Sequence, residues 1–201
     1  KEHYDKTKLK LTITGTCLND YKPHFFNYEN TPDMEILNAI RISSSIPLIF
    51  IPMVYDNTLW LDGGMTENYP INICDSDIEN TLGICIHDDC LNNCEDKTPK
   101  DIAEYLVQVF KCFVFAESWK NILKYEKNTI KYSYSMTVFS NFDIDKTTIE
   151  NMVQVGYDQA KEQRSIIENF IIDNNPNSET LSQTESDLIH KIISDVENES
   201  T

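Results

Sequence analysis

Glycine, tryptophan and basic residues are scarce in this 201-residue chain. It has five glycines and two tryptophans, and its 17 Lys and Arg against 33 Asp and Glu give a net charge of −16. A nucleic-acid-binding surface needs clustered basic side chains, so nucleic acid is excluded as a partner. The same deficit argues against electrostatic docking on anionic lipid. No apolar run approaches the roughly 18 residues that a membrane-spanning helix needs.

The negative charge is concentrated in two stretches. Residues 75–96 carry a net charge of −7 and residues 173–201 one of −6, and both are typical of solvated surface. We expect one domain over residues 1–172 and an acidic, mobile tail over 173–201. Strand-like runs alternate with capped helices, which predicts an α/β fold with a layered sheet flanked by helices.

The six cysteines do not form an obvious metal-binding pattern. Cys85 and Cys112 lie in apolar runs and are expected to be buried free thiols. The stretch His87-Asp88-Asp89-Cys90 and Cys94 gathers possible ligands, but no second Cys or His pair follows at zinc spacing. We therefore expect no metal, reduced thiols, and a cytoplasmic or intracellular location.

Local patterns predict where the elements begin. Alternation or apolar runs indicate strands at 8–14, 24–28, 81–86 and 130–139, and capping patterns indicate helices that open at 31–33, 98–101 and 147–150. The apolar stripe that follows residue 101 is expected to pack into the core rather than line an acyl-chain pocket. His24 is expected to be structural, and Ser43-Ser44-Ser45 to be small residues at a close helix contact rather than nucleophiles.

The sequence Trp60-Leu61-Asp62-Gly63-Gly64 is the most informative motif. A strand that ends in Asp-Gly-Gly places a carboxylate at a fixed position while the glycines let the backbone turn tightly beside it. A fold can present a catalytic base in this way. Taken alone, the motif is more typical of an ordinary surface turn.

The neighbouring residues extend this motif into an ordered block. A helix end runs into a buried, proline-bracketed segment over 39–52, and Asn68-Tyr69-Pro70-Ile71 follows the glycines. Together with Asp62-Gly63-Gly64, these elements resemble the second half of a patatin-like phospholipase domain, over a span from Lys8 to about Ala160. Leu48 departs from the pattern, since the family often has glycine after that proline.

The resemblance implies a function and a set of site residues. In the family, the Asp of this motif is one half of a Ser–Asp catalytic dyad, so Asp62 would be the catalytic base. Gly63 and Gly64 would complete the motif, and Asn68 and Pro70 would support the loop. The implied substrate is a phospholipid or another acyl ester, with membrane contact only through that substrate, and the chemistry needs no cofactor or metal.

The family's nucleophile is not in this sequence. It lies in a G-x-S-x-G elbow, which occurs nowhere in the 201 residues, and Gly15 is the only glycine before Gly63. We therefore expect the chain to be the C-terminal portion of a patatin-like domain, incomplete as a fold and inactive alone.

Two alternatives remain open. The chain could be a non-catalytic patatin-like remnant that acts as a binding or interaction module through its acidic loop and tail. It could also be a generic α/β domain whose match is fortuitous. The sequence leaves the lipid specificity, the balance between hydrolysis and transacylation, and the oligomeric state open.

Overall fold

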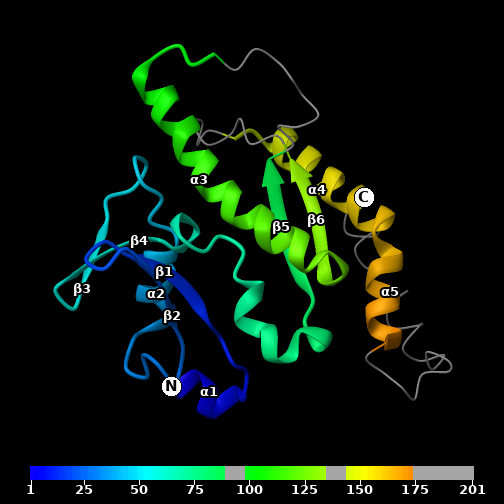
Figure 1. Cartoon of the computed structure of the whole chain (residues 1–201), viewed down its shortest axis with the longest axis horizontal. Coiled ribbons are helices and arrows are strands. Elements are labelled where there is room, and N and C mark those ends of the chain that lie inside the picture. The colour runs from blue at the N-terminus through cyan, green and yellow to red at the C-terminus, as the bar shows by residue number, and fades with distance from the viewer. Residues whose placement is uncertain (89–97, 135–143, 174–201) are drawn as a thin grey trace.

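The computed structural model describes residues 1–88, 98–134 and 144–173, which form two small sheets with helices packed on them (Figure 1). The elements in chain order are α1 (Glu2–Thr7), β1 (Ile13–Cys17), β2 (Lys22–Phe26), α2 (Ile36–Ser43), β3 (Met53–Tyr55), β4 (Thr58–Asp62), η1 (Gly63–Met65), η2 (Ile71–Asn80), β5 (Gly83–Asp88), α3 (Ile102–Lys124), η3 (Glu126–Asn128), β6 (Thr129–Tyr134), α4 (Lys146–Glu162) and α5 (Arg164–Asp173). The mixture of helices, antiparallel strands and parallel strands confirms the expected α/β class.

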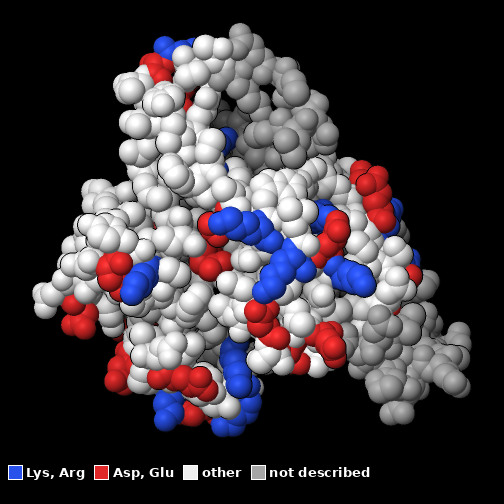
Figure 2. Space-filling model, viewed as in Figure 1, with Lys and Arg blue, Asp and Glu red and all other residues white. Residues whose placement is uncertain are grey.

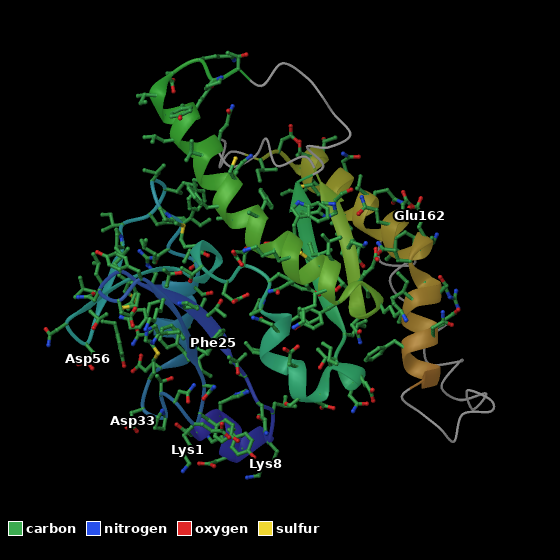
Figure 3. All side chains as sticks on the ribbon, viewed as in Figure 1. Lys1, Lys8, Phe25, Asp33, Asp56 and Glu162 are labelled. Carbon is green, nitrogen blue, oxygen red and sulfur yellow. The ribbon has the colours of Figure 1, made fainter. Side chains whose placement is uncertain are left out.

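The first sheet is antiparallel, with the strand order β2-β1-β4-β3. Strand β1 lies between β2 and β4, so Gly15 pairs with His24 on one side and with Asp62 on the other. Strands β3 and β4 form a tight hairpin whose two turn residues, Asp56 and Asn57, have φ angles of 50° and 57°. Asn and Asp tolerate this left-handed region, which a type I′ turn requires. Asp56 lies at the tip of the hairpin (Figure 3).

Helix α2 covers the inner face of this sheet. Its buried side chains pack with three strand residues into one core, which comprises Cys17, Phe26, Ala39, Ile42 and Trp60. The Nε1–H group of Trp60 donates to the carbonyl of Tyr55 at 3.2 Å, so this large aromatic side chain is buried with its polar atom paired. This core holds β4 in place, and β4 carries Asp62.

The second sheet is a parallel pair, β5 and β6, with partners from Gly83↔Thr129 to Asp88↔Tyr134. Parallel neighbours need a crossover connection, and α3 lies in that connection in the chain. A second core forms where α3 and the loop before β5 meet β5, and it comprises Tyr69, Ile71, Cys85, Ile122 and Tyr125. Helix α4 packs against β6, on the side of that strand that faces away from β5 (Figure 1).

Two of the predicted helix starts are wrong, at α2 and α4, and the one at α3 is confirmed. The helix expected to open at Thr31 begins at Ile36, and the carbonyl of Thr31 instead accepts the N–H of Met34 in a turn. Asp101 caps α3 through the N–H of Glu104, as expected for the 98–101 pattern. Asp145, not Thr147, caps α4 by accepting the N–H of Thr148 at 2.7 Å.

Other expectations also need correction. The first strand begins at Ile13 rather than at Lys8, and the long helix expected after 147 is interrupted at Gln163, between α4 and α5. Cys85 is buried as predicted, but Cys112 lies on the exposed face of α3. The strand containing Cys85 is buried on one face only, since Ile84 and Ile86 are 63% and 57% exposed.

Three of the predictions concern residues that lie wholly or partly outside the described ranges. These are the acidic tail after residue 173, the cysteines at 90 and 94, and the end of the strand expected to reach 139. On the described surface, acidic and basic side chains are interspersed rather than segregated over the face shown in Figure 2. None of the described helices is both long and apolar enough to cross a lipid bilayer.

Candidate functional site

Asp62 is the last residue of β4, where the strand gives way to a single helical turn. Its backbone is held on two sides: its N–H donates to the carbonyl of Ser45 at 3.0 Å, and its carbonyl accepts the Thr16 hydroxyl at 2.8 Å. Thr16 also contacts the hydroxyl of Thr66, 2.9 Å away across the turn. The position of Asp62 is therefore fixed by the segment that follows α2, by β1 and by the turn that follows β4.

The carboxylate of Asp62 has one protein partner. Its Oδ1 accepts the N–H of Gly64 at 2.7 Å, and within the described residues its Oδ2 accepts no hydrogen bond. Burial raises the pKa of Asp62 above its usual value of 3.8, and the Gly64 hydrogen bond offsets part of that rise because it stabilises the ionised form. The result is a half-buried carboxylate that is more basic than usual and has an oxygen available.

The two glycines are needed for close packing. A Cβ atom on Gly63 would lie 2.6 Å from the backbone oxygen of Thr14 and 2.3 Å from its hydroxyl oxygen. A Cβ on Gly64 would lie 2.9 Å from Oδ1 of Asp62 and 2.8 Å from Oδ1 of Asn68. Neither glycine has a positive φ, so the expected tight turn is explained by steric contact rather than by left-handed backbone.

Asn68 links this loop to α3. Its Nδ2 donates to the Ser118 hydroxyl at 2.8 Å, and that hydroxyl in turn donates to the carbonyl of Val114. The side-chain amide of Asn68 therefore connects the loop to α3. Pro70 immediately precedes η2, and its carbonyl accepts the N–H of Ile73.

A second carboxylate lies in the same loop. The Oε1 of Glu67 accepts the Nδ2 group of Asn121 at 3.0 Å, and that group also donates to the carbonyl of Tyr69 at 2.8 Å. Burial raises the pKa of Glu67 above its usual value, while hydrogen bonds from Asn72 and Asn121 partly offset the rise. Glu67 is not predicted as a site residue from the sequence, because its spacing of five residues from Asp62 carries no recognisable motif.

The proline-bracketed segment at 46–52 is not buried, contrary to expectation. Leu48 and Ile51 are 70% and 82% exposed, and Leu48 has a φ of 71°. The family often has glycine at this position, and glycine adopts that backbone without strain. Arg41 bonds both ends of this region. Its guanidinium donates to the Ser45 hydroxyl at 2.6 Å and to the carbonyl of Ile51 at 3.3 Å.

Ser44, Ser45 and His24 all make local contacts within the described part of the chain. Ser45 is fully buried, and its hydroxyl donates to the carbonyl of Arg41 at 2.7 Å. Ser44 bonds the carbonyl of Ile40 in the same way. His24 lies edge-on to Trp60, with ring centroids 5.1 Å apart, and its Nε2 lies 2.9 Å from Oδ2 of Asp20. A separate shallow hollow between α1 and α2 is lined by Tyr4, Phe26, Tyr28 and Met34 among others, and Asp62 does not line it.

Comparison with known proteins shows what the first part of the chain is similar to. Residues 5–75 match the sequence model of the patatin-like phospholipases, a span that contains all five predicted site residues. A probable lipid hydrolase of Invertebrate iridescent virus 6 is 45% identical over 73 residues, which is 36% of this chain and 25% of that protein. An uncharacterized protein of Acanthamoeba polyphaga mimivirus is 38% identical over 81 residues, 40% of this chain and 27% of that protein. The chain spans about a quarter of the length of these curated relatives.

Proposed function

Since residues 5–75 match the sequence model of the patatin-like phospholipases, we propose that this chain supplies the catalytic base of a lipid acyl hydrolase, and that Asp62 is that base. The observation that carries the proposal is the state of its carboxylate at the end of β4. It is half-buried, fixed through Oδ1 by the N–H of Gly64, and raised in pKa by burial. The name of the iridescent virus relative, a probable lipid hydrolase, supports the same class of substrate.

The proposed reaction is acyl transfer from an ester to water. The Asp62 carboxylate accepts the proton of a serine hydroxyl as that hydroxyl attacks the ester carbonyl, and it passes the proton to the departing alcohol oxygen as the acyl-enzyme forms. Water then attacks the acyl-enzyme while the same carboxylate takes the water proton, which returns to the serine oxygen as the carboxylic acid leaves. A base of this kind must be ionised yet basic, and burial favours the second condition by raising the pKa of the Asp62 carboxyl.

The serine and the oxyanion donors come from outside these 201 residues under this proposal. The described residues of 1–88 place no serine against the Asp62 carboxylate, and the nearby Ser45 hydroxyl is bonded to Arg41. Developing charge on the ester oxygen needs preorganised N–H donors, for which the sequence contains no glycine-rich loop before Gly63. The proposal therefore assigns the base and its support to this chain.

We also propose that the protein lies inside the cell and contacts a membrane only through its lipid substrate.

The test is ester hydrolysis by the intact protein and two matched variants. Asp62→Asn keeps the shape and the acceptor for Gly64 but removes the base, and we expect it to lower kcat by about 10³-fold or more. Asp56→Asn makes the same change on the same hairpin, at an exposed turn position that asparagine tolerates, and should leave kcat unchanged. Normal turnover of a p-nitrophenyl ester by Asp62→Asn would reject the assignment.

The non-catalytic alternative is separated from this proposal by the gene and by the isolated chain. A glycine-rich loop followed by G-x-S-x-G upstream in the same reading frame supports the hydrolase. A protein that lacks both and hydrolyses no ester supports a binding or interaction module. We expect the 201-residue chain alone to hydrolyse nothing, and Asp62-dependent hydrolysis by that chain would show that its nucleophile lies within it.

A further inference from the structure

The hairpin formed by β1 and β2 gathers three different metal-binding side chains. The sulfur of Cys17, a carboxylate oxygen of Asp20 and an imidazole nitrogen of His24 all lie within 4.8 Å of one another. We propose that these three residues bind a divalent transition-metal ion, and that Zn²⁺ is the ion their donor set fits best. The proposal does not depend on the hydrolase function.

The backbone of the hairpin brings the three groups together. Cys17 ends β1 opposite Lys22, and His24 lies two residues further along β2, opposite Gly15. Cys17 and His24 are therefore diagonal neighbours on one face of the sheet, within reach of each other's side chains. Asp20 lies in the connecting turn, where its Oδ1 accepts the N–H of Lys22 at 3.1 Å. The other carboxylate oxygen of Asp20, Oδ2, faces His24 and lies 2.9 Å from its Nε2.

Two of the three groups are partly exposed, so an ion can reach them, and the third is buried, so its position is fixed. The side chains of His24 and Asp20 are 42% and 41% exposed, so an ion can reach them from solvent. Cys17 is 4% exposed and packs in the core with Trp60 and Phe26. The His24 ring is held against Trp60. The sulfur and the imidazole are thus positioned by the fold before any ion binds.

The donor set selects a borderline-soft ion. Thiolate, imidazole and carboxylate are the ligands of Zn²⁺, whereas Mg²⁺ and Ca²⁺ prefer sets made of oxygen. With one thiolate and one carboxylate, Zn²⁺ leaves the site neutral, which limits the cost of placing charge beside a buried sulfur. The thiol gives up its proton to solvent and the imidazole binds in its neutral form. Three protein ligands leave the fourth tetrahedral position to water.

Only small movements are needed for coordination. Bonds of about 2.0–2.3 Å in a tetrahedral site place donor atoms roughly 3.3–3.8 Å apart. The separations here are at most 4.8 Å, and the shorter one between His24 and Asp20 is a hydrogen bond that the ion replaces. No metal is expected from the sequence, because it has no second Cys or His pair at zinc spacing. The spacing Cys-x₂-Asp-x₃-His does not by itself indicate a metal site. The three side chains come together only because β1 and β2 form a hairpin.

A bound ion would stabilise the part of the sheet that supports Asp62. It would join the two strands of the hairpin beside Gly15 and Thr16, which are respectively the pairing partner of Asp62 and the donor to its carbonyl. A site that is absent from the unfolded chain contributes its binding free energy to folding. We therefore expect added Zn²⁺ to raise the Tm of the full chain.

The test is a titration of the reduced full chain with Co²⁺, a spectroscopic substitute for Zn²⁺. We expect a thiolate-to-cobalt charge-transfer absorption that saturates at one equivalent and is displaced by Zn²⁺. His24→Gln should weaken binding by at least about 100-fold, since loss of a direct ligand exceeds the effect of losing its support. His24→Cys replaces one ligand with another, and it should retain binding with stronger charge-transfer absorption.

Three further variants separate this site from the other cysteines. Cys17→Ser should lose the absorption, whereas Cys112→Ser and the double variant Cys90→Ser/Cys94→Ser should retain it. Absorption that survives His24→Gln unchanged, or that disappears only with Cys90 and Cys94, would overturn the proposal. Because Cys17 is buried, Cys17→Ser is first compared with the unsubstituted chain by circular dichroism. If it does not fold, the two variants at the half-exposed His24 decide the question.

Discussion

The side-chain amide of Gln163 pairs with the backbone of Lys131 as a neighbouring strand would. Its Oε1 accepts the Lys131 N–H at 2.9 Å, and its Nε2 donates to the Lys131 carbonyl at 2.6 Å. Gln159, one helical turn earlier, makes the same two bonds with Ser133 at 2.9 and 2.7 Å. An open strand edge is a template for unwanted pairing. Two glutamines thus close the outer edge of β6 over the residues that the structure describes.

Replacing Gln163 with alanine should destabilise the chain. The substitution leaves one N–H and one carbonyl of a half-buried strand unpaired, which costs about 1–3 kcal/mol of the free energy of unfolding. Gln154→Ala is the matched control on α4, the helix that Gln163 terminates, because that side chain is exposed and bonds Asp158; its effect should stay within about 0.5 kcal/mol. Urea denaturation of the full chain measures both. Equal losses would mean that the amide pairing does not stabilise β6.

Gly63→Ala should be the more damaging of two glycine substitutions. The new Cβ would lie 2.6 Å from the backbone oxygen of Thr14, which cannot move without displacing β1. Overpacking of this kind costs about 1–3 kcal/mol. Gly156→Ala, within α4, meets nothing within 4 Å and should instead stabilise the chain by roughly 0.5–1 kcal/mol. Thermal unfolding of the two variants compares them directly, and a stable Gly63→Ala protein would contradict the packing around Asp62.

The local geometry around Asp62 could be predicted from the sequence because the residues that form it are close together in the chain. Asp62, Gly63, Gly64, Asn68 and Pro70 lie within nine residues, and the structure does place Asp62 at a strand end beside two closely packed glycines. What could not be predicted is the set of long-range partners. Thr16 and Ser118 contact this loop from 46 and 50 residues away in the chain, and no local pattern marks either of them.

Helix starts were misplaced for a related reason. Thr31 and Thr147 each have the residue type of a cap, but Thr31 is used in a turn, and Asp145 lies two residues earlier and accepts the bond instead. Burial of the 46–52 segment was wrong because apolar composition alone does not identify the surface that covers it. Leu48 and Ile51 are apolar yet exposed in this chain.

The stability of the chain should depend on pH through Asp62. Because burial raises its pKa, the folded state keeps the proton to a higher pH than the unfolded state does. The free energy of unfolding therefore falls as pH rises above the usual value of 3.8, through the raised pKa of the folded state.

Asp62→Asn tests this dependence, since it cannot ionise and keeps the acceptor for Gly64. The variant should be more stable than the unsubstituted chain at about pH 7, and this advantage should shrink as the pH is lowered toward about 3. Urea midpoints across that range measure the difference, with Asp56→Asn as the exposed control. A variant that is less stable at neutral pH would indicate that the ionised carboxylate has a favourable partner. A gain in stability with a loss of hydrolysis is the trade expected of a catalytic group.

The thiols of Cys85 and Cys112 should react at very different rates. Cys85 is buried in the second core, and burial raises its pKa to about 11, so the reactive thiolate is rare at neutral pH. Cys112 is exposed on α3. We expect iodoacetamide to modify Cys112 at least about 10-fold faster, as followed by mass spectrometry of the two peptides. In urea the two rates should converge, because the protection comes from α3 packing on β5. Equal rates in the native chain would mean that α3 does not cover β5 in solution, and the contact between Asn68 and Ser118 on that helix would then be lost as well.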